Sequence, residues 1–278
     1  MIHEYLDFAV TVAQSAGRLV LQNYRGNFVC RKEDGSEVTE ADVLAERLMR
    51  TMIERRYPSH HILGEELGYS GSLGGKYVWV LDPIDGTAWY AMGTPLFGTL
   101  VGLLENGEPI VGVIHLPALG ETVCAARGHG CWSIEGASTP KRIHVSASVS
   151  IEDATVTASG VHGSDFLGNE GSSLFHLRSV MQSVPKFKLY GDCVQHVLVC
   201  KGLTHAAIDT VMKPWDSAAI IPCVDEAGGV VSTLDGRRSR VVFGGSLLTS
   251  CSPSLHQDIL LRVRTGGSLP DCRTGVAM

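Results

Sequence analysis

The sequence has no basic stripe, no long apolar run and no signal-peptide pattern. Of its 278 residues, 23 are Lys or Arg and 29 are Asp or Glu, so the formal net charge is −6. Nucleic-acid binding needs clustered basic residues, and this balance argues against it. No uninterrupted apolar stretch reaches the roughly 20 residues that span a bilayer, which argues against membrane insertion. Residues 1–7 lack a basic segment followed by an apolar core, so we expect no signal peptide there.

The sequence also lacks any Cys-x-x-Cys pair. Because zinc sites and redox motifs use such pairs, zinc is not expected. In a chain of this length we expect reduced, mostly buried thiols and a cytoplasmic location. The eight cysteines lie at positions 30, 124, 131, 193, 200, 223, 251 and 272.

The composition allows a large hydrophobic core. Hydrophobic residues make up 44% of the chain, and its length suits one large domain or two closely packed ones. The sequence becomes serine-rich around residues 143–150, and we place a domain boundary there. This predicts an N-terminal α+β domain over residues 1–145 and a C-terminal α/β domain over residues 146–278. The polar, glycine-rich segment 266–278 is expected to be loosely ordered.

Two helices are predicted in the N-terminal part. Residues 3–25 carry an apolar face, and Gly26 favours a helix end. Thr39 and Asp42 resemble a capping box and predict a second helix start, with Asp in place of the usual Glu or Gln. Apolar residues then recur at four-residue spacing until Pro58. The apolar positions that mark the two helices are Phe8, Val12, Leu19 and Val20, then Leu44, Leu48 and Met52.

A β-rich stretch follows these helices. Asn106-Gly107 lies between the apolar runs 96–104 and 109–116, which is a strong hairpin signal. A further strand is predicted over 122–126. The second half alternates between strands and helices, a pattern typical of α/β proteins. Its predicted strands lie near 154–158, 187–190, 204–209 and 230–232, and its predicted helices near 170–183, 193–201 and 216–227.

The segment 79–87, Trp-Val-Leu-Asp-Pro-Ile-Asp-Gly-Thr, is chemically the most informative. Residues 77–81 are typical of a buried strand, which Pro83 is predicted to end. Asp82 and Asp85 follow, and such close carboxylates disfavour joint ionisation unless a hard cation such as magnesium neutralises them. Backbone N–H groups near Gly86 and Thr87 suit a phosphate. The alternative is an ordinary turn, since Asp and Gly both favour turns.

Further acidic residues stand at comparable places. Glu65 and Glu66 follow the apolar run 61–63, and Asp216 precedes the apolar stretch 218–221. The alternative for the two glutamates is a solvated turn, and for Asp216 it is helix capping. Asp42 starts the second predicted helix, a position from which a carboxylate can also face an adjacent site.

Together these motifs resemble the inositol monophosphatase family. The resemblance rests on Gly-Glu-Glu at 64–66, Asp-Pro-Ile-Asp-Gly-Thr at 82–87 and Trp-Asp at 215–216, in this order. Val-Thr-Glu-Ala-Asp at 38–42 and Glu-Ala-Gly-Gly at 226–229 support it, so most of the chain is covered. The resemblance implies an α/β fold, a layered α–β–α–β–α sandwich of the sugar phosphatase type. It also implies a magnesium-dependent, lithium-sensitive phosphomonoesterase and a homodimer.

The same resemblance implies roles for individual residues. Glu65, Asp82 and the Ile84 carbonyl would form a first metal site. Asp82 would bridge to a second site completed by Asp85 and Asp216, and Glu65 would support a third, weaker ion. Asp42 and Thr87 would orient and deprotonate the attacking water, while the N–H groups of Gly86 and Thr87 hold the phosphate. Two to three magnesium ions are therefore expected.

The expected substrate is a small phosphate ester. Segments 95–99, 191–193 and 213–216 resemble the histidinol-phosphate phosphatase branch, although Ala88-Trp89-Tyr90 departs from it. Histidinol carries an amine, and Asp192 and Asp209 are candidate anions for it. The alternatives are a strand-to-helix turn residue for Asp192 and a solvated strand-end carboxylate for Asp209. His162, His196, Trp89 and Tyr90 are candidates either for substrate contact or for packing.

Two other functions stay open. An inositol monophosphatase or broad sugar phosphatase would use the same chemistry. A catalytically silent scaffold or regulator is a third possibility, and it would be expected to lack one metal carboxylate or Thr87. All of these residues are present.

Overall fold

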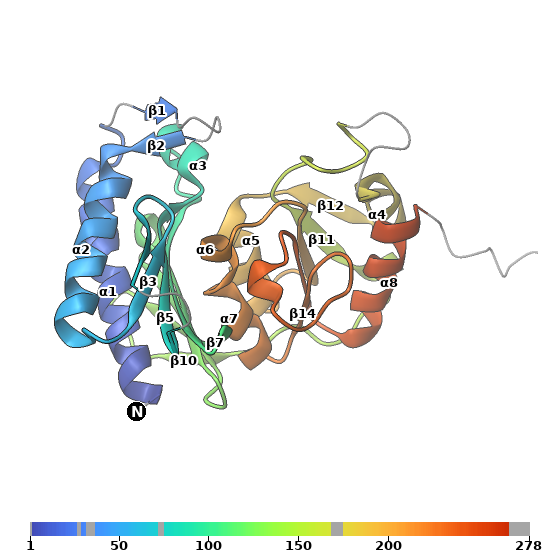
Figure 1. The fold of residues 1–278 in the computed structure, drawn as a ribbon. Helices are drawn as coiled ribbons and strands as arrows, with labels where there is room; N and C mark the ends of the chain where they lie inside the picture. Colours follow the sequence, from blue (N-terminus) through green and yellow to red (C-terminus); the bar gives the residue numbers. More distant parts are fainter. Residues whose placement is uncertain (1, 27–28, 32–36, 72–74, 168–174, 267–278) are drawn as a thin grey trace, which may run out of the picture.

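Five layers, alternating helices and sheets, stack across the molecule (Figure 1). This arrangement is the predicted α–β–α–β–α sandwich. The computed structural model describes residues 2–26, 29–31, 37–71, 75–167 and 175–266. The predicted loose tail lies outside these residues, except for Gly266. Among the described helices, none combines the length and the apolar character needed to cross a membrane.

The first layer consists of α1 (Ile2–Asn23) and α2 (Glu40–Arg56), which pack on one face of the large sheet (Figure 1). Both helices were predicted, and Thr39 caps α2 as expected. The predicted apolar positions of α2 were displaced by one residue from the buried ones. Leu44 is exposed, and the buried face is formed by the positions next to the predicted ones. That face consists of Ala41, Ala45, Met49 and Ile53. Small side chains let α2 lie close to its neighbours, which a search for large apolar residues overlooks.

The second layer is an eight-stranded sheet in the order β10-β9-β8-β7-β6-β5-β3-β4. Only β3 and β5 pair in parallel; the other neighbours are antiparallel. The predicted hairpin at Asn106-Gly107 is present, with positive φ at both residues. The strands are β3 (His61–Gly64), β4 (Gly68–Ser70), β5 (Tyr77–Asp85), β6 (Gly98–Glu105), β7 (Glu108–Leu116), β8 (Glu121–Ala126), β9 (Cys131–Glu135) and β10 (Lys141–Ile143).

The central helices separate this sheet from a smaller one. They are α5 (Asp192–Cys200), α6 (Pro214–Ser217) and α7 (Ile220–Glu226), so the helix predicted over 216–227 is divided in two. Two strand glycines allow close contact with the large sheet: a Cβ on Gly102 would lie 2.8 Å from the Ala218 Cβ, and one on Gly112 would lie 2.1 Å from the Ala219 carbonyl oxygen. These contacts hold the junction of α6 and α7 against β6 and β7, and β6 pairs with β5, which carries the acidic motif.

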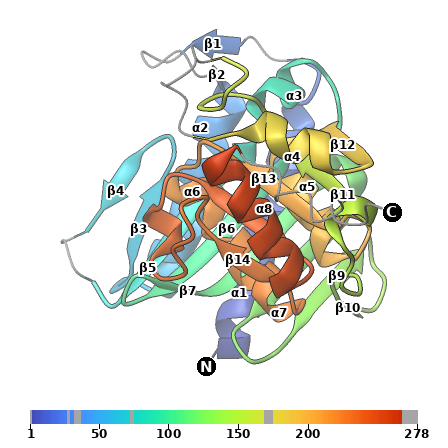
Figure 2. The same cartoon turned by 90° about the vertical axis from the view of Figure 1, so that its right-hand side faces the viewer.

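The smaller sheet has the order β12-β11-β13-β15-β14. Its strands are β11 (Thr155–Ala158), β12 (Lys186–Leu189), β13 (Ala206–Asp209), β14 (Val230–Ser232) and β15 (Leu247–Ser250). The outer helices α4 (Leu177–Ser183) and α8 (Pro253–Thr265) cover its far face (Figure 2). The predicted helix near 170–183 thus begins at Leu177, and residues 170–174 lie outside the described part. Short elements complete the chain: β1 (Val29–Arg31), β2 (Glu37–Thr39), α3 (Thr87–Ala91) and single 3-10 turns at Pro117–Leu119, Ile151–Asp153 and Val241–Phe243.

The chain passes from the large to the small sheet between Ile143 and Thr155. One apolar cluster nevertheless joins both halves, because Val80 and Leu100 of the large sheet share it with Val197 of α5. Because the two halves share this cluster, the division of the chain into two domains at residue 145 stays a prediction. Six cysteines are buried and free, in agreement with the expected reduced thiols: Cys124, Cys131, Cys193, Cys200, Cys223 and Cys251. The side chain at position 30 and the whole of residue 272 lie outside the described part of the chain.

Candidate active site

A β-bulge at the end of β5 brings the two central aspartates together. Asp82 pairs with Leu100 of β6 and Asp85 pairs with Gly98, so β5 has one residue more than β6 between these pairs. Residues three apart in a regular strand face opposite sides, and the extra residue restores a common side. The prediction that Pro83 ends the strand was wrong: β5 continues to Asp85. The Thr99 hydroxyl donates to the Pro83 carbonyl at 2.9 Å and fixes the bulge.

Asp216 reaches the same place from α6. Its carboxylate accepts from the Lys213 N–H at 2.7 Å, so the predicted helix-start role is real. Single carboxylate oxygens of Asp82, Asp85 and Asp216 nevertheless lie within 4.8 Å of one another. The Asp216 side chain therefore both caps the start of α6 and belongs to the acidic cluster. Asp85 is also held from the small-sheet half, because the Cys193 N–H of α5 donates to it at 2.6 Å.

The acidic cluster raises the proton affinity of its members. Burial raises the pKa of Asp82 well above its ordinary value, and its neighbours raise it further. In order of effect these neighbours are Glu65, Asp85, Asp216 and Asp42. Burial also raises the pKa of Asp85 well above normal and that of Asp216 to about 7. The predicted carboxylates thus influence one another in a single electrostatic unit.

Asp42 and Glu65 enter this unit from the other side of β5. Asp42 is fully buried in the first turn of α2, where one of its oxygens accepts from the Thr39 N–H at 2.8 Å and from the Thr39 hydroxyl at 2.6 Å. Glu65 begins the turn between β3 and β4, and its N–H donates to the Leu81 carbonyl at 3.2 Å. That bond places Glu65 beside the residue that precedes Asp82.

The segment after the bulge turns sharply into α3. Gly86 has φ +86°, in the left-handed region that favours glycine, and a Cβ there would lie 3.0 Å from both the Leu96 carbonyl oxygen and an Asp192 oxygen. The Thr87 hydroxyl donates to the Ile84 carbonyl at 2.9 Å. The two atoms predicted to serve water activation and metal binding are thus in direct contact.

Asp192 and Asp209 line a cavity of about 60 Å³ together with Asp85 and Asp216. Burial, followed by the charge of Asp209, raises the pKa of Asp192 to about 6, while a hydrogen bond from Trp89 opposes this shift. Asp209 is only 3% exposed, so the solvated alternative for it is wrong. Gln195 Nε2 donates to both Asp209 oxygens, at 3.0 and 2.9 Å.

The other candidates for substrate contact differ in how deeply their side chains are buried. His196 is fully buried between Asp209 (2.6 Å) and the Thr249 hydroxyl (2.8 Å), as in the packing alternative. Tyr90 belongs to the core, where its hydroxyl donates to the Val20 carbonyl at 3.1 Å. Trp89 is partly exposed and packs closely on Gly191. A Cβ added to Gly191 would lie only 2.5 Å from the indole nitrogen of Trp89. His162 is exposed and does not line this cavity.

Two buried charged residues near the site, Glu46 and Arg50, were not predicted from the sequence. They form an ion pair of 2.7 Å on α2 and contact the turn that carries Glu65. The available signal was their spacing, since Asp42, Glu46 and Arg50 follow one another at four-residue intervals and share one helix face.

The donor set fits a hard divalent cation. It consists of carboxylate oxygens with a backbone carbonyl close by, the ligands that magnesium and calcium prefer, and contains no thiolate. The raised pKa values of Asp82, Asp85 and Asp216 show that the cluster lacks compensating positive charge from the described part of the protein. The residues can therefore bind a metal ion.

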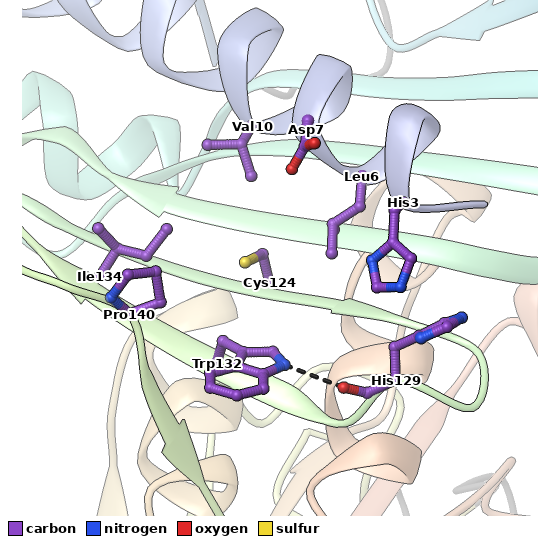
Figure 3. Close-up of a pocket in the computed structure, with 9 residues that line it drawn as sticks. All are labelled: His3, Leu6, Asp7, Val10, Cys124, His129, Trp132, Ile134 and Pro140. Carbon is purple, nitrogen blue, oxygen red and sulfur yellow. Dashed lines mark hydrogen bonds between the residues drawn. The ribbon is translucent and has the colours of Figure 1, made fainter. Parts of the chain in front are cut away.

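A second cavity, of about 390 Å³, lies between α1 and strands β8 and β9 (Figure 3). Its wall is mainly apolar, with Leu6, Val10 and Trp132, and Asp7 is its only carboxylate. Beside this carboxylate it offers His3, His129 and Cys124, not the clustered oxygen ligands that magnesium prefers, so hard-cation chemistry concentrates at the β5 bulge.

A sequence profile described as the inositol monophosphatase family matches residues 1–266. The chain belongs to this family. It is 34% identical to a histidinol-phosphatase of Chlorobaculum parvum, over 94% of this chain and 97% of that protein. It is 33% identical to a histidinol-phosphatase of Mycobacterium tuberculosis, over 96% and 100%. A fructose-1,6-bisphosphatase/inositol-1-monophosphatase of Aquifex aeolicus is 31% identical, over 93% and 95%.

Solved structures of the inositol monophosphatase family have the same fold. The extragenic suppressor protein suhB of Bartonella henselae superposes with a TM-score of 0.83 at 25% identity, covering 95% of this chain and 99% of that one. An inositol monophosphatase of Thermotoga maritima gives a TM-score of 0.78 at 27% identity, covering 93% and 96%. Family membership identifies the chain as a phosphatase, a phosphoric monoester hydrolase.

Proposed function

We propose that the protein is a magnesium-dependent phosphomonoesterase that hydrolyses histidinol phosphate to histidinol and phosphate. The observation that carries this proposal is the bulge in β5, because it turns Asp82 and Asp85 to one side and faces them with Asp216. The similarity to histidinol-phosphatases over almost the whole chain supports the choice of substrate.

Four acidic residues and one carbonyl would hold two to three magnesium ions. One ion would be bound by Glu65, Asp82 and the Ile84 carbonyl. A second would be bound by Asp82, Asp85 and Asp216, and a third would be supported by Glu65. When bound, magnesium supplies positive charge that stabilises the phosphoryl oxygens and the leaving oxygen and lowers the pKa of a water. The buried carboxylates of this chain would then be ionised, because the cations offset their repulsion.

The protein's own groups would position and activate the nucleophile. Thr87 and Asp42 would orient the attacking water, and Asp42 would accept its proton. Asp42 suits this role because two Thr39 groups fix one of its oxygens and with it the orientation of the carboxylate. The backbone N–H groups of Gly86 and Thr87 would bind the phosphate, and the positive φ of Gly86 permits the sharp turn that places them. No covalent intermediate on Thr87 is expected.

The leaving-group side of the cavity favours a cationic alcohol. Asp192 and Asp209 line it, and both are carboxylates within a strongly acidic environment. An ammonium group would relieve their repulsion, whereas a neutral polyol would not. Asp192 is the stronger candidate for direct contact, because both oxygens of Asp209 already accept hydrogen bonds from Gln195.

Comparing two substrates tests this choice. We expect kcat/KM for histidinol phosphate to exceed that for inositol 1-phosphate by at least about tenfold. Replacement of Asp192 by Asn should raise KM for the amine-bearing ester and leave that for inositol 1-phosphate nearly unchanged. Preference for inositol 1-phosphate would instead favour the second candidate, an inositol monophosphatase, which the Aquifex relative supports.

We also propose a homodimer and a cytoplasmic location for the protein. The dimer is inferred from the family resemblance, and the location from the scattered, unpaired cysteines. Sedimentation velocity should give a mass near twice the 29.8 kDa of the chain, whereas a single species of 29.8 kDa would contradict the dimer.

A further inference from the structure

The turn that carries Glu65 has little support from the sheet itself. It comprises three residues between β3 and β4, and β4 is a three-residue strand at the edge of the large sheet. An edge strand has a neighbour on one side only, so its backbone is held less firmly than that of β5. A residue that ligates a metal from such a turn needs an additional anchor.

Glu46 of α2 provides this anchor from beneath the turn. Its carboxylate accepts from the Glu66 N–H at 2.7 Å and from the Leu67 N–H at 3.2 Å. The approach depends on Gly64, where a Cβ would lie 2.1 Å from a Glu46 oxygen. Glu46 itself is fully buried, so its carboxylate reaches the turn from inside the protein.

Arg50 extends the anchor along β4. Its Nε donates to Glu46 at 2.7 Å, and its two terminal nitrogens donate to the Ser70 hydroxyl at 3.1 Å and to the Gly68 carbonyl. Arg50 is 8% exposed, which makes the pair with Glu46 a buried one. Together the two side chains bond to the second half of the turn and to the strand that follows it.

The anchor also fixes Glu65 relative to Asp42. Asp42, Glu46 and Arg50 lie at four-residue intervals in α2 and therefore on one face of a rigid helix. Asp42 influences Asp82 from the first turn of this face, and Glu65 influences Asp82 from the anchored turn. A displacement of the turn would move Glu65 away from the other carboxylates without moving Asp42.

Stability alone does not account for this pair. Replacing a buried ion pair with apolar residues of similar volume is often neutral or stabilising, so the pair is weak evidence for a role in folding. Its bonds to the backbone of the three residues that directly follow one proposed ligand, Glu65, point to a role in geometry.

We propose that Glu46 and Arg50 are positioning residues that hold Glu65 at its place in the metal site. The inference rests on the proposed function, in which Glu65 is a metal ligand. Neither Glu46 nor Arg50 is proposed to contact the substrate or the metal. Its expected signature is a weakened affinity for magnesium with a nearly unchanged kcat once magnesium is saturating.

The test is calorimetric titration of magnesium into the substrate-free protein. Glu46→Gln keeps the shape of the side chain but loses one acceptor, and we expect the weaker magnesium site to lose about tenfold in affinity, or about 1.4 kcal/mol. In a Glu65→Gln background the same substitution should change affinity by less than about twofold, since coupled residues are not additive. Arg50→Gln should act in the same direction, and Arg50→Lys should recover part of the affinity.

Arg262 offers a matched control. It is a buried helix arginine, 5% exposed, with an acidic partner four residues earlier, Asp258, at 3.8 Å. We expect both Arg262→Gln and Arg50→Gln to lower the melting temperature, but Arg262→Gln to leave magnesium affinity unchanged. Equal magnesium affinities for wild type, Glu46→Gln and Arg262→Gln would overturn the inference.

Amide hydrogen exchange separates the inference from the proposed function. The Glu66 and Leu67 amides should exchange faster in Glu46→Gln than in wild type, with or without magnesium. Unchanged exchange at both amides would overturn the anchoring role even if the enzyme binds magnesium. A wild-type protein that binds no magnesium would instead overturn the proposed function, and the assigned purpose of the anchor with it.

Discussion

Among single residues, Asp82 is the one on which the proposed metal site depends most. It is 1% exposed and is the carboxylate whose pKa responds to four acidic neighbours. Asp82→Asn removes one charge without changing volume, so the fold should persist while phosphate release falls at least about a thousandfold, the scale of a lost electrostatic contribution to catalysis. A phosphate-release assay beside a circular dichroism spectrum checks both parts. Wild-type-like turnover by this variant would refute the bridging role.

The raised pKa values also predict how metal-free stability depends on pH. Asp192 and Asp216 have folded pKa values of about 6 and about 7, above the unfolded value of about 4. The folded state then binds more protons than the unfolded state, so stability falls as pH rises from about 4 through these values. In a chelating buffer the melting temperature should decrease over this range, and this decrease should be smaller in Asp216→Asn.

Magnesium should reverse this decrease, because a bound cation favours the ionised carboxylates. The gain in melting temperature on adding magnesium should therefore be larger at about pH 7.5 than at about pH 5. Asp225 provides a control, since burial raises its pKa to about 6 but it lines a different cavity with Arg127 and Arg238. If Asp225→Asn reduced the magnesium effect as much as Asp216→Asn, the shift could not be assigned to the acidic cluster.

The residues that were predictable from sequence are those with a local signal. Asp82, Asp85 and Asp216 follow or precede apolar runs, and the structure brings their carboxylates together. Glu46 and Arg50 were missed because their partners lie about 20 positions away in the turn after β3. The burial of Asp209 was missed for the same reason: Gln195, which binds it, comes from another element.

At the scale of elements, the bulge in β5 is the feature that makes the site. Thr99 is fully buried and donates to the Pro83 carbonyl at the bulge. Thr99→Val should leave that carbonyl without this donor, at a cost of about 1–3 kcal/mol. We also expect kcat/KM to fall about tenfold, because small displacements of catalytic groups are costly. Chemical denaturation and steady-state kinetics measure the two effects.

Thr157→Val is the matched control for this variant. Thr157 is a buried strand threonine of the small sheet, and its hydroxyl donates to the Ala206 carbonyl at 3.3 Å. The control should lose stability and keep wild-type kcat/KM. If the two valine variants showed the same kcat/KM, the bulge would not be the source of the site geometry.

Element types were easier to predict than element details. The hairpin at Asn106-Gly107 and the start of α2 at Thr39 have strong local chemistry, and both were right. The extension of β5 beyond Pro83 depends on pairing with β6, and the division of the 216–227 helix depends on packing against the large sheet. Such long-range contacts leave little trace in the local sequence.

At the scale of the whole molecule, the site exists only because both halves meet. Asp82 and Asp85 lie in the large sheet, whereas Asp216 and the Cys193 N–H come from the central helices. The layered arrangement followed from the family resemblance, and the alternation of strands and helices alone would not have given it. The glycines at positions 102 and 112 show how it is achieved, through close contact between the central helices and the large sheet.

Lithium should inhibit the protein by competing at a magnesium position of this composite site. Lithium carries one charge and binds oxygen ligands, so it can replace magnesium without supplying the same charge to the transition state. Inhibition should appear at millimolar lithium, with sodium at equal ionic strength as the control. Full activity at high millimolar lithium would argue against the family mechanism in this chain.

The central claim is that this acidic cluster, with magnesium, hydrolyses a phosphate ester of a cationic alcohol. The most direct measurement is release of inorganic phosphate from histidinol phosphate by the purified protein, with magnesium and with a chelator. We expect turnover that requires magnesium and is lost on chelation. No phosphate release from histidinol phosphate or from any phosphomonoester in a broad panel, in the presence of magnesium, would contradict it.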